Sequence, residues 1–175
     1  GNSNKIGSGI DFSFGGGVFN TGSGSMTLTN CTLSGNFSQF GGGVYNSGGS
    51  MTLTNCTLSG NSASIWGGGV NNGDEGTMTL TNSTVSGNTA SSNGGGVKNF
   101  SAFTLTNSIV AKNTGASNNP DIDASFGSII DGGHNLIGDG TGQSSLMNAN
   151  NGNQVGTAMD PIDPLFIMDV PANDS

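Results

Sequence analysis

Apolar and polar residues alternate in short runs along the first two thirds of the chain, and these runs return at a nearly constant spacing. Three consecutive glycines begin at Gly15, Gly41, Gly67 and Gly94, which gives spacings of 26, 26 and 27 residues. Alternation with a period of two places successive side chains on opposite faces of a β-strand. The sequence therefore predicts short strands that return at the same place in every repeat.

Each repeat holds three such runs. In the first repeat, Val18 follows the glycines, Met26 and Leu28 alternate with threonine, and Cys31 and Leu33 alternate in the third run. One repeat buries too little apolar surface to fold alone, so stacked repeats must share a continuous core. Three short strands in about 26 residues predict one coil of an all-β, right-handed parallel β-helix, with roughly five to six coils in the chain.

Glycine and asparagine return at fixed offsets because a chain that turns sharply needs left-handed backbone conformations. Glycine adopts these without penalty and asparagine tolerates them. Asparagines at one corner can also stack, each amide bonding the next coil. One ladder is expected at Asn30, Asn55, Asn82 and Asn107, and a second at Asn36, Asn61, Asn88 and Asn113.

The regular pattern divides the chain into two parts of a single domain that spans residues 1–175. Residues 1–114 carry the regular repeats, whereas residues 115–175 predict degenerate final coils and a closing segment. Gly1-Asn2 matches Gly35-Asn36, so we expect the sequence to open partway through a coil and to be a piece of a longer chain.

Composition and charge exclude some classes of partner. The chain has three lysines (Lys5, Lys98 and Lys112), no arginine and a net charge of −8. Nucleic-acid binding needs clustered basic residues for phosphate contacts, so no nucleic-acid partner is expected. No apolar run is long enough to cross a bilayer, so no membrane insertion is expected.

Two cysteines, Cys31 and Cys56, occupy equivalent positions in adjacent repeats. Parallel neighbouring strands would hold their Cα atoms about 4.8 Å apart, which lies within the range of a disulfide. Alternatively, they are small buried residues that stand where later repeats have Ser83 and Ser108. The sequence leaves both alternatives open.

Two blocks of the repeat, GGGV(F/Y)N and NCTLSGN, resemble those of polymorphic-outer-membrane-protein-like right-handed β-helices on bacterial surfaces. NPDIDASFGSIIDGGHNLIGDGTG at 119–142, with the later NGNQVGT and DPIDPLF, is similar to the closing segment of secreted bacterial β-helix proteins. The resemblance implies an extracellular or cell-surface protein with a structural or adhesive role and a variable C-terminal anchor. IMDVPANDS after Phe166 departs from it, because the expected Gly- and Pro-rich sequence does not follow.

Candidate catalytic groups are sparse. A glycosidase needs two carboxylates at a defined separation, yet Asp74, Glu75 and Lys98 are the only charged residues between Asp11 and Lys112. We therefore expect no catalytic site. The alternative is a polysaccharide-active enzyme whose site lies in coils outside this sequence.

Acidic residues gather late in the chain and raise the question of a metal. Asp121, Asp123 and Asp139 are candidate Ca²⁺ ligands, since Ca²⁺ prefers carboxylate and carbonyl oxygens. Aspartate also serves turns by bonding its own backbone, and no full calcium loop is present. We expect no cofactor, and we expect His134 to occupy a turn rather than bind a ligand.

Two outward surfaces are candidate binding faces. Thr-x-Thr recurs in four repeats and would form two flat columns, which resembles the face of β-solenoid ice-binding proteins, although threonine also simply suits exposed strands. These residues are Thr27, Thr29, Thr52, Thr54, Thr79, Thr81, Thr104 and Thr106. A second outward column, Phe19, Tyr45, Asn71 and Lys98, would offer aromatic rings to a sugar or a protein.

Nearly every repeated residue has an architectural reason, so the sequence predicts a non-catalytic extracellular structural or adhesive β-helix. The open sheet edges at its ends predict self-association, end to end, into a filament. Glycans and other surface proteins are the further expected partners, and a carbohydrate- or ice-binding solenoid is the alternative function.

Overall fold

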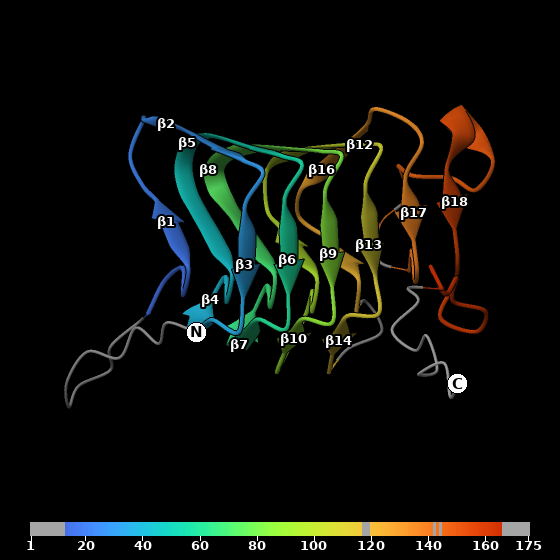
Figure 1. Ribbon diagram of the computed structural model, residues 1–175, viewed down its shortest axis with the longest axis horizontal. Coiled ribbons are helices and arrows are strands. Elements are labelled where there is room, and N and C mark those ends of the chain that lie inside the picture. Colours follow the sequence, from blue (N-terminus) through green and yellow to red (C-terminus); the bar gives the residue numbers. More distant parts are fainter. Residues whose placement is uncertain (1–12, 117–119, 142, 144, 166–175) are drawn as a thin grey trace, which may run out of the picture.

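The computed structural model describes residues 13–116, 120–141, 143 and 145–165. Parallel strands stack along one axis into a β-solenoid of about four turns, in which every coil lies directly against the next (Figure 1). The repeat of about 26 residues is therefore one turn of a parallel β-helix, as the sequence predicts. The expected five to six coils was too high, because the strands after residue 115 are short and do not complete regular turns.

Three parallel sheets run along the solenoid. The eight-stranded sheet contains β1 (Val18–Asn20), β2 (Ser25–Thr29), β5 (Val44–Thr54), β8 (Val70–Thr81), β11 (Val97–Asn99), β12 (Ala102–Thr106), β15 (Ile122–Asp123) and β16 (Ser128–Asp131). The six-stranded sheet contains β3 (Thr32–Ser34), β6 (Thr57–Ser59), β9 (Thr84–Ser86), β13 (Ile109–Ala111), β17 (Leu136–Ile137) and β18 (Gln154–Val155). The four-stranded sheet contains β4 (Phe37–Phe40), β7 (Ser62–Trp66), β10 (Thr89–Ala90) and β14 (Thr114–Gly115), and a short 3₁₀ turn, η1, spans Asn150–Gly152.

The division of each coil into strands differs from the expected one. The first two apolar runs of the repeat lie in one sheet and merge into single long strands in β5 and β8. The third sheet instead comes from the segment before the glycines, which lies outside the three apolar runs. Small side chains explain this, since Ser38, Ala63 and Ala90 point inward there and pack where no bulky apolar pattern announces a strand.

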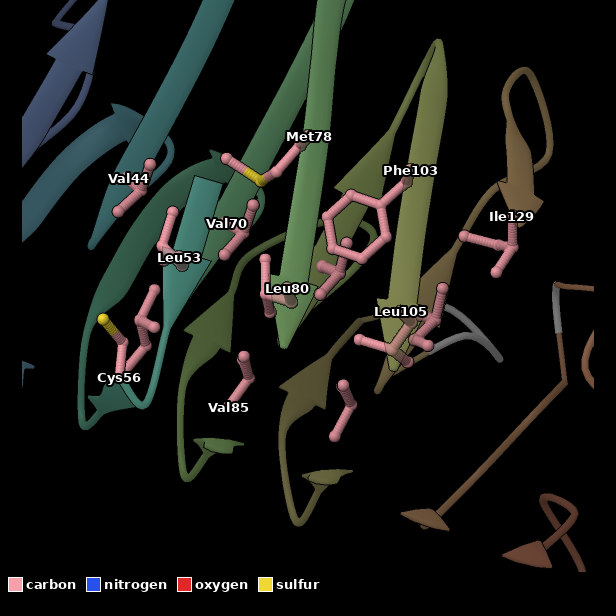
Figure 2. Packing of buried hydrophobic residues seen from close by; sticks show 14 of the residues in the cluster. Val44, Leu53, Cys56, Val70, Met78, Leu80, Val85, Phe103, Leu105 and Ile129 are labelled. Atoms are coloured by element: carbon pink, nitrogen blue, oxygen red, sulfur yellow. The ribbon is translucent and has the colours of Figure 1, made fainter. Parts of the chain in front are cut away.

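The core is a column of apolar side chains that repeats from coil to coil (Figure 2). Leu53, Leu80 and Leu105 are fully buried, and Met51, Met78 and Phe103 lie two residues earlier along the same strands. Strand pairing holds these residues in register, with Leu53 opposite Leu80 and Leu80 opposite Leu105. The expected inward set therefore forms the core.

Asparagine stacks tie the coils together on the inside. Asn61 donates its amide to the Oδ1 of Asn88 at 3.0 Å, and Asn88 donates to Asn113 at the same distance. Asn36 donates to Asn61 at 2.9 Å, so the stack runs through four coils. Its members are buried, and each Oδ1 acceptor also receives the backbone N–H of the preceding member.

A second buried stack, which the sequence did not identify, lies in the eight-stranded sheet. It links Asn20, Asn46, Asn72 and Asn99 by amide hydrogen bonds of 2.8, 3.0 and 2.8 Å. By contrast, the ladder expected at Asn30, Asn55, Asn82 and Asn107 lies at an exposed corner. These four residues adopt φ between 45° and 55°. Their amides pair in only two places in the described chain, Asn55 with Asn30 and Asn107 with Asn82.

Cys31 and Cys56 are free thiols, Cys56 buried and Cys31 half-buried. The Sγ of Cys56 donates to the carbonyl of Thr54, the same type of contact that Ser83 and Ser108 make in the later coils. The second alternative is therefore correct, and the cysteines stand in for small buried serines.

Candidate functional site

An aromatic-lined cleft, with a volume of about 350 Å³, lies on the outer side of the solenoid where the glycine runs turn the chain from the four-stranded to the eight-stranded sheet. We call it the aromatic cleft. Its described lining comprises Phe14, Phe40, Tyr45, Trp66, Asn71, Gly73, Asp74 and Phe100. Five of these eight residues carry aromatic rings, and they come from successive coils.

The glycines explain why rings from both sides of the corner converge. Phe40 precedes one glycine run and Tyr45 follows it after a valine. Gly42 must lack a side chain there, because a Cβ atom would come within 2.4 Å of the carbonyl oxygen of Ser62 and within 2.5 Å of that of Gly68. The corner is therefore tight enough to bring two sheets, and the aromatic residues at their edges, side by side.

The rings form two rows along the solenoid axis. Phe14 stacks on both Phe40 and Tyr45, with centroid separations of 5.5 and 5.3 Å, and so joins the rows at one end. Trp66 lies 5.4 Å from Phe40 and 5.4 Å from Phe100, but its plane is tilted by 56° to each of them. Trp66 is therefore not stacked in parallel on either neighbour, whereas Phe14 is stacked in parallel on both Phe40 and Tyr45.

Asn71 provides the polar group of the cleft. It lies in β8, in register with Tyr45 on one side and Lys98 on the other, and its side chain is only 2% exposed. Its Oδ1 has no hydrogen-bond partner, the one such buried atom among the described residues. A buried acceptor without a partner is costly, and native structures rarely keep one without a reason such as a ligand.

Lys98 lies one coil further on and is closed off from solvent. Its Nζ donates to the Oδ2 of Asp123 at 2.8 Å, and it sits 4.7 and 5.2 Å from the ring centroids of Phe100 and Phe126. Burial opposes the charge on Asp123, but hydrogen bonds from Lys98, Ser125 and Asn93 outweigh it and lower the pKa of Asp123 to about 2. The charges of Lys98 and Asp123 therefore neutralise each other inside the protein.

The second outward column, Phe19, Tyr45, Asn71 and Lys98, lies in register on one face, as expected. Its exposure to solvent differs from the expected one. Phe19 is 40% exposed, whereas Asn71 and Lys98 are 2% exposed each. The expectation that all four lie open to solvent was wrong, because the neighbouring aromatic rows cover the later coils. The sequence also missed the cleft residues Phe14, Phe40, Trp66, Phe100 and Asp74. An aromatic residue directly before three of the glycine runs, Phe14, Phe40 and Trp66, was a visible signal for part of this set.

The Thr-x-Thr columns lie in register on the outer face of the eight-stranded sheet, with Thr27, Thr52, Thr79 and Thr104 opposite one another and likewise Thr29, Thr54, Thr81 and Thr106. In the first coil they are exposed, and in the next three they are half-buried. Within the described residues, no buried side-chain polar atom on this face lacks a partner. Ice binding stays a prediction.

Each of the three candidate metal ligands accepts hydrogen bonds from groups of the protein. Asp121 stands where the buried ladder would have its next asparagine, and its Oδ1 accepts the amide of Asn113 at 2.8 Å. Burial raises the pKa of Asp121, against the opposing effect of its N–H donors. Asp123 forms an ion pair with Lys98, and the Oδ1 of Asp139 accepts a hydrogen bond from the backbone N–H of Thr141. No cluster of three or more potential metal ligands occurs in the described parts of the chain.

Asp121 and Asp139 also line a second cavity of about 380 Å³, together with Lys112 and Asp163, which form an exposed ion pair. His134 has a left-handed backbone with φ of 58° and lies between strands, which agrees with its expected place in a turn.

Over the described ranges, no helix is long and apolar enough to cross a membrane. Comparison of the chain with protein-family models, curated proteins and solved structures found no match.

Proposed function

We propose that this chain is a non-catalytic, adhesive β-helix protein that binds carbohydrate in the aromatic cleft and works outside the cell. The observation that carries the proposal is the amide of Asn71, buried in a cleft of aromatic rings and without a partner for its Oδ1. Binding sites for small ligands are typically concave and mostly apolar, with a few placed polar groups that fix orientation.

A saccharide matches both features of the cleft. The C–H faces of a sugar ring pack on aromatic faces, and its hydroxyl groups supply the hydrogen-bond donors that an amide oxygen needs. Trp66 is the ring best placed for such packing, since its faces are not stacked on those of its neighbours.

Adhesion without catalysis fits the charges of the cleft. Hydrolysis of a glycosidic bond ordinarily uses two carboxylates that flank it. Among the described residues that line the cleft, Asp74 is the one carboxylate. We therefore expect a bound oligosaccharide to be released unchanged.

Membership of the polymorphic-outer-membrane-protein-like repeats and a place on a bacterial surface remain part of the proposal. What supports them is that the two resembling blocks have defined tasks in the solenoid. The glycine run builds the tight corner beside the cleft, and the NCTLSGN block ends in Asn61 of the buried ladder.

The test is calorimetric titration of the protein with neutral, amino and acidic oligosaccharides, with the fluorescence of Trp66, the single tryptophan, as a second readout. Trp66→Ala should weaken binding at least about tenfold, because it removes the principal stacking surface. Phe37→Ala is the matched control, since Phe37 is an exposed aromatic residue (45%) that does not line the cleft. Failure of every oligosaccharide class to bind, or equal effects of both substitutions, would contradict the proposal.

End-to-end assembly is a second candidate function, supported by the first coil. Strands β2 and β3 pair on one side only within the described chain, and Met26 and Leu28 of β2 are half-buried where Met51 and Leu53 are 1% and 0% exposed. An unpaired edge can pair with another chain. Sedimentation velocity over a range of concentrations tests this, and a strictly monomeric protein would contradict it.

A further inference from the structure

The charges around the aromatic cleft indicate which class of sugar it would accept. Asp74 is exposed at its rim and has no ion-pair partner among the described residues. No lysine, arginine or histidine is among the described lining residues. The acceptor atoms, the carboxylate of Asp74 and the Oδ1 of Asn71, both need donors from a ligand.

The nearest cation cannot serve an acidic ligand. Lys98 is 2% exposed and already bound by Asp123, so its charge is neutralised inside the protein. The other described lysine, Lys112, is paired with Asp163 beside the second cavity. A carboxylated sugar in the aromatic cleft would therefore meet Asp74 as a like charge with no compensating cation, on a chain of net charge −8.

The next coil shows how this protein holds an ammonium group. There, the Nζ of Lys98 lies over the rings of Phe100 and Phe126 and donates to a carboxylate, that of Asp123. The amide of Asn93 completes the set by bonding the same carboxylate oxygen at 2.6 Å. Aromatic faces attract cations through the ring quadrupole, and the attraction grows when water is excluded.

The aromatic cleft, one coil earlier, gathers the same kinds of group, aromatic rings and a carboxylate, although Asp74 is not the register equivalent of Asp123. Asn71 takes the register position of Lys98, and the space beside it is open. Phe100 is shared by both places, Trp66 adds a second ring, and Asp74 supplies the carboxylate. No ammonium group is among the described residues that line the cleft.

We propose that the aromatic cleft binds an amino sugar with a free ammonium group, such as a glucosamine unit of a polysaccharide. The ammonium group lies against the rings and pairs with Asp74, and a hydroxyl group donates to the Oδ1 of Asn71. This inference rests on the proposed carbohydrate-binding function and names its substrate class.

The experiment titrates the protein with three hexasaccharide probes: one of glucosamine, one of N-acetylglucosamine and one of galacturonic acid. Calorimetry at about pH 6 keeps the amine of the glucosamine probe protonated. The glucosamine probe should bind at least about tenfold more tightly than the acetylated one, and its affinity should fall as salt is added. The galacturonic acid probe should bind most weakly.

Asp74→Asn should reduce the affinity for the glucosamine probe about tenfold and leave the acetylated probe nearly unchanged. Glu75→Gln is the matched control, because it removes the same charge from the adjacent exposed residue, which does not line the cleft. The control separates binding in the cleft from a general attraction of an acidic chain for a polycation.

The outcomes for the two proposals are distinct. Equal binding of the acetylated and free-amine probes, tighter binding of the acidic probe, or equal effects of Asp74→Asn and Glu75→Gln would overturn the amino-sugar inference. In the first two of these cases, the carbohydrate-binding function survives if Trp66→Ala still weakens binding and Phe37→Ala does not. If none of the three probes binds, and neutral oligosaccharides also fail, both proposals are wrong.

Discussion

Two columns of side chains alternate along the same strands of the eight-stranded sheet and differ in what each coil places there. The inward column has asparagine in every coil, Asn20, Asn46, Asn72 and Asn99, joined by hydrogen bonds of 2.8 to 3.0 Å. The outward column changes residue at every coil, from Phe19 to Tyr45 to Asn71 to Lys98. Asn71 and Asn72 are therefore adjacent in sequence, but Asn72 belongs to the hydrogen-bonded inward column and Asn71 to the outward column that changes from coil to coil.

The difference teaches where to look for function in a repeat protein. A position that holds the same residue in every coil has an architectural task, because stacking the coils demands the same bond each time. A position that changes between coils is free of that demand. In this chain the changing column lies beside the aromatic cleft, and it contains the one buried side-chain polar atom among the described residues that the fold leaves without a hydrogen-bond partner.

The largest expected effect comes from Lys98, which lies in the changing column yet is part of the fold. Lys98→Met should lower the free energy of unfolding by about 3 to 5 kcal/mol, since it leaves the buried charge of Asp123 without its partner. Urea denaturation followed by fluorescence measures this. The double variant Lys98→Met with Asp123→Asn should lose less than the single one, and an equal or greater loss would contradict the explanation.

The same pair predicts a dependence on pH with a defined sign. The folded pKa of Asp123, about 2, lies below its ordinary value of 3.8, so the stability it contributes is present above 3.8 and is lost as pH falls toward 2. In the Lys98→Met variant, protonation of Asp123 at low pH removes the cost of burying its unpaired charge. The gap in stability between the two proteins should therefore narrow from pH 7 to pH 3, and a constant gap would count against this account.

Substituting the two neighbouring asparagines tests the comparison itself. Asn72→Ala should destabilise the protein by about 2 to 3 kcal/mol, because it removes the bonds to Asn46, Asn99 and the carbonyl of Ala102 in a fully buried place. Asn71→Ala should change stability by less than about 0.5 kcal/mol, since its Oδ1 has no bond to lose, and should weaken ligand binding. Equal destabilisation by both would remove the distinction between the columns.

The sequence predicts the fold well because its regularities are those of the architecture. Leucine at the centre of each Thr-Leu-Thr run identified the core, and asparagine after each Ser-Gly identified a buried ladder. The third sheet was missed because its inward residues, such as Ser38 and Ala63, are too small to form an apolar pattern. Small residues in a strand give little periodic signal although they pack fully.

The candidate site was predictable only in part, for a related reason. The outward column could be read from its register, but its burial could not, because the covering rings of Phe100 and Phe126 come from positions outside the repeat. The lack of a partner for Asn71 is a property of three-dimensional packing. The repeat separates Asn71 from Asn72, which recurs in every coil, but no spacing shows that the Oδ1 of Asn71 is left without a partner.

A smaller effect is expected at the exposed asparagine corner. Asn55 has φ of 53° and donates its amide to Asn30 at 3.1 Å in contact with solvent. Asn55→Ala should cost about 1 kcal/mol, mainly because alanine disfavours the left-handed conformation. Asn55→Gly, which removes the amide but accepts this backbone, should cost less than the alanine variant. A glycine variant as unstable as alanine would assign the effect to the hydrogen bond.

The smallest effect is expected on the Thr-x-Thr face, where repetition reflects strand propensity. Thr79 is half-buried on the outer face, opposite Thr52 and Thr104. Valine keeps the branched shape that suits a strand, so Thr79→Val should change stability by less than about 0.5 kcal/mol and leave glycan binding intact. The same variant in an ice recrystallisation assay sharpens the comparison of faces. If the parent protein inhibits recrystallisation and Thr79→Val abolishes this, the repeated face has a binding task as well, and constancy from coil to coil is no longer a sign of architecture alone.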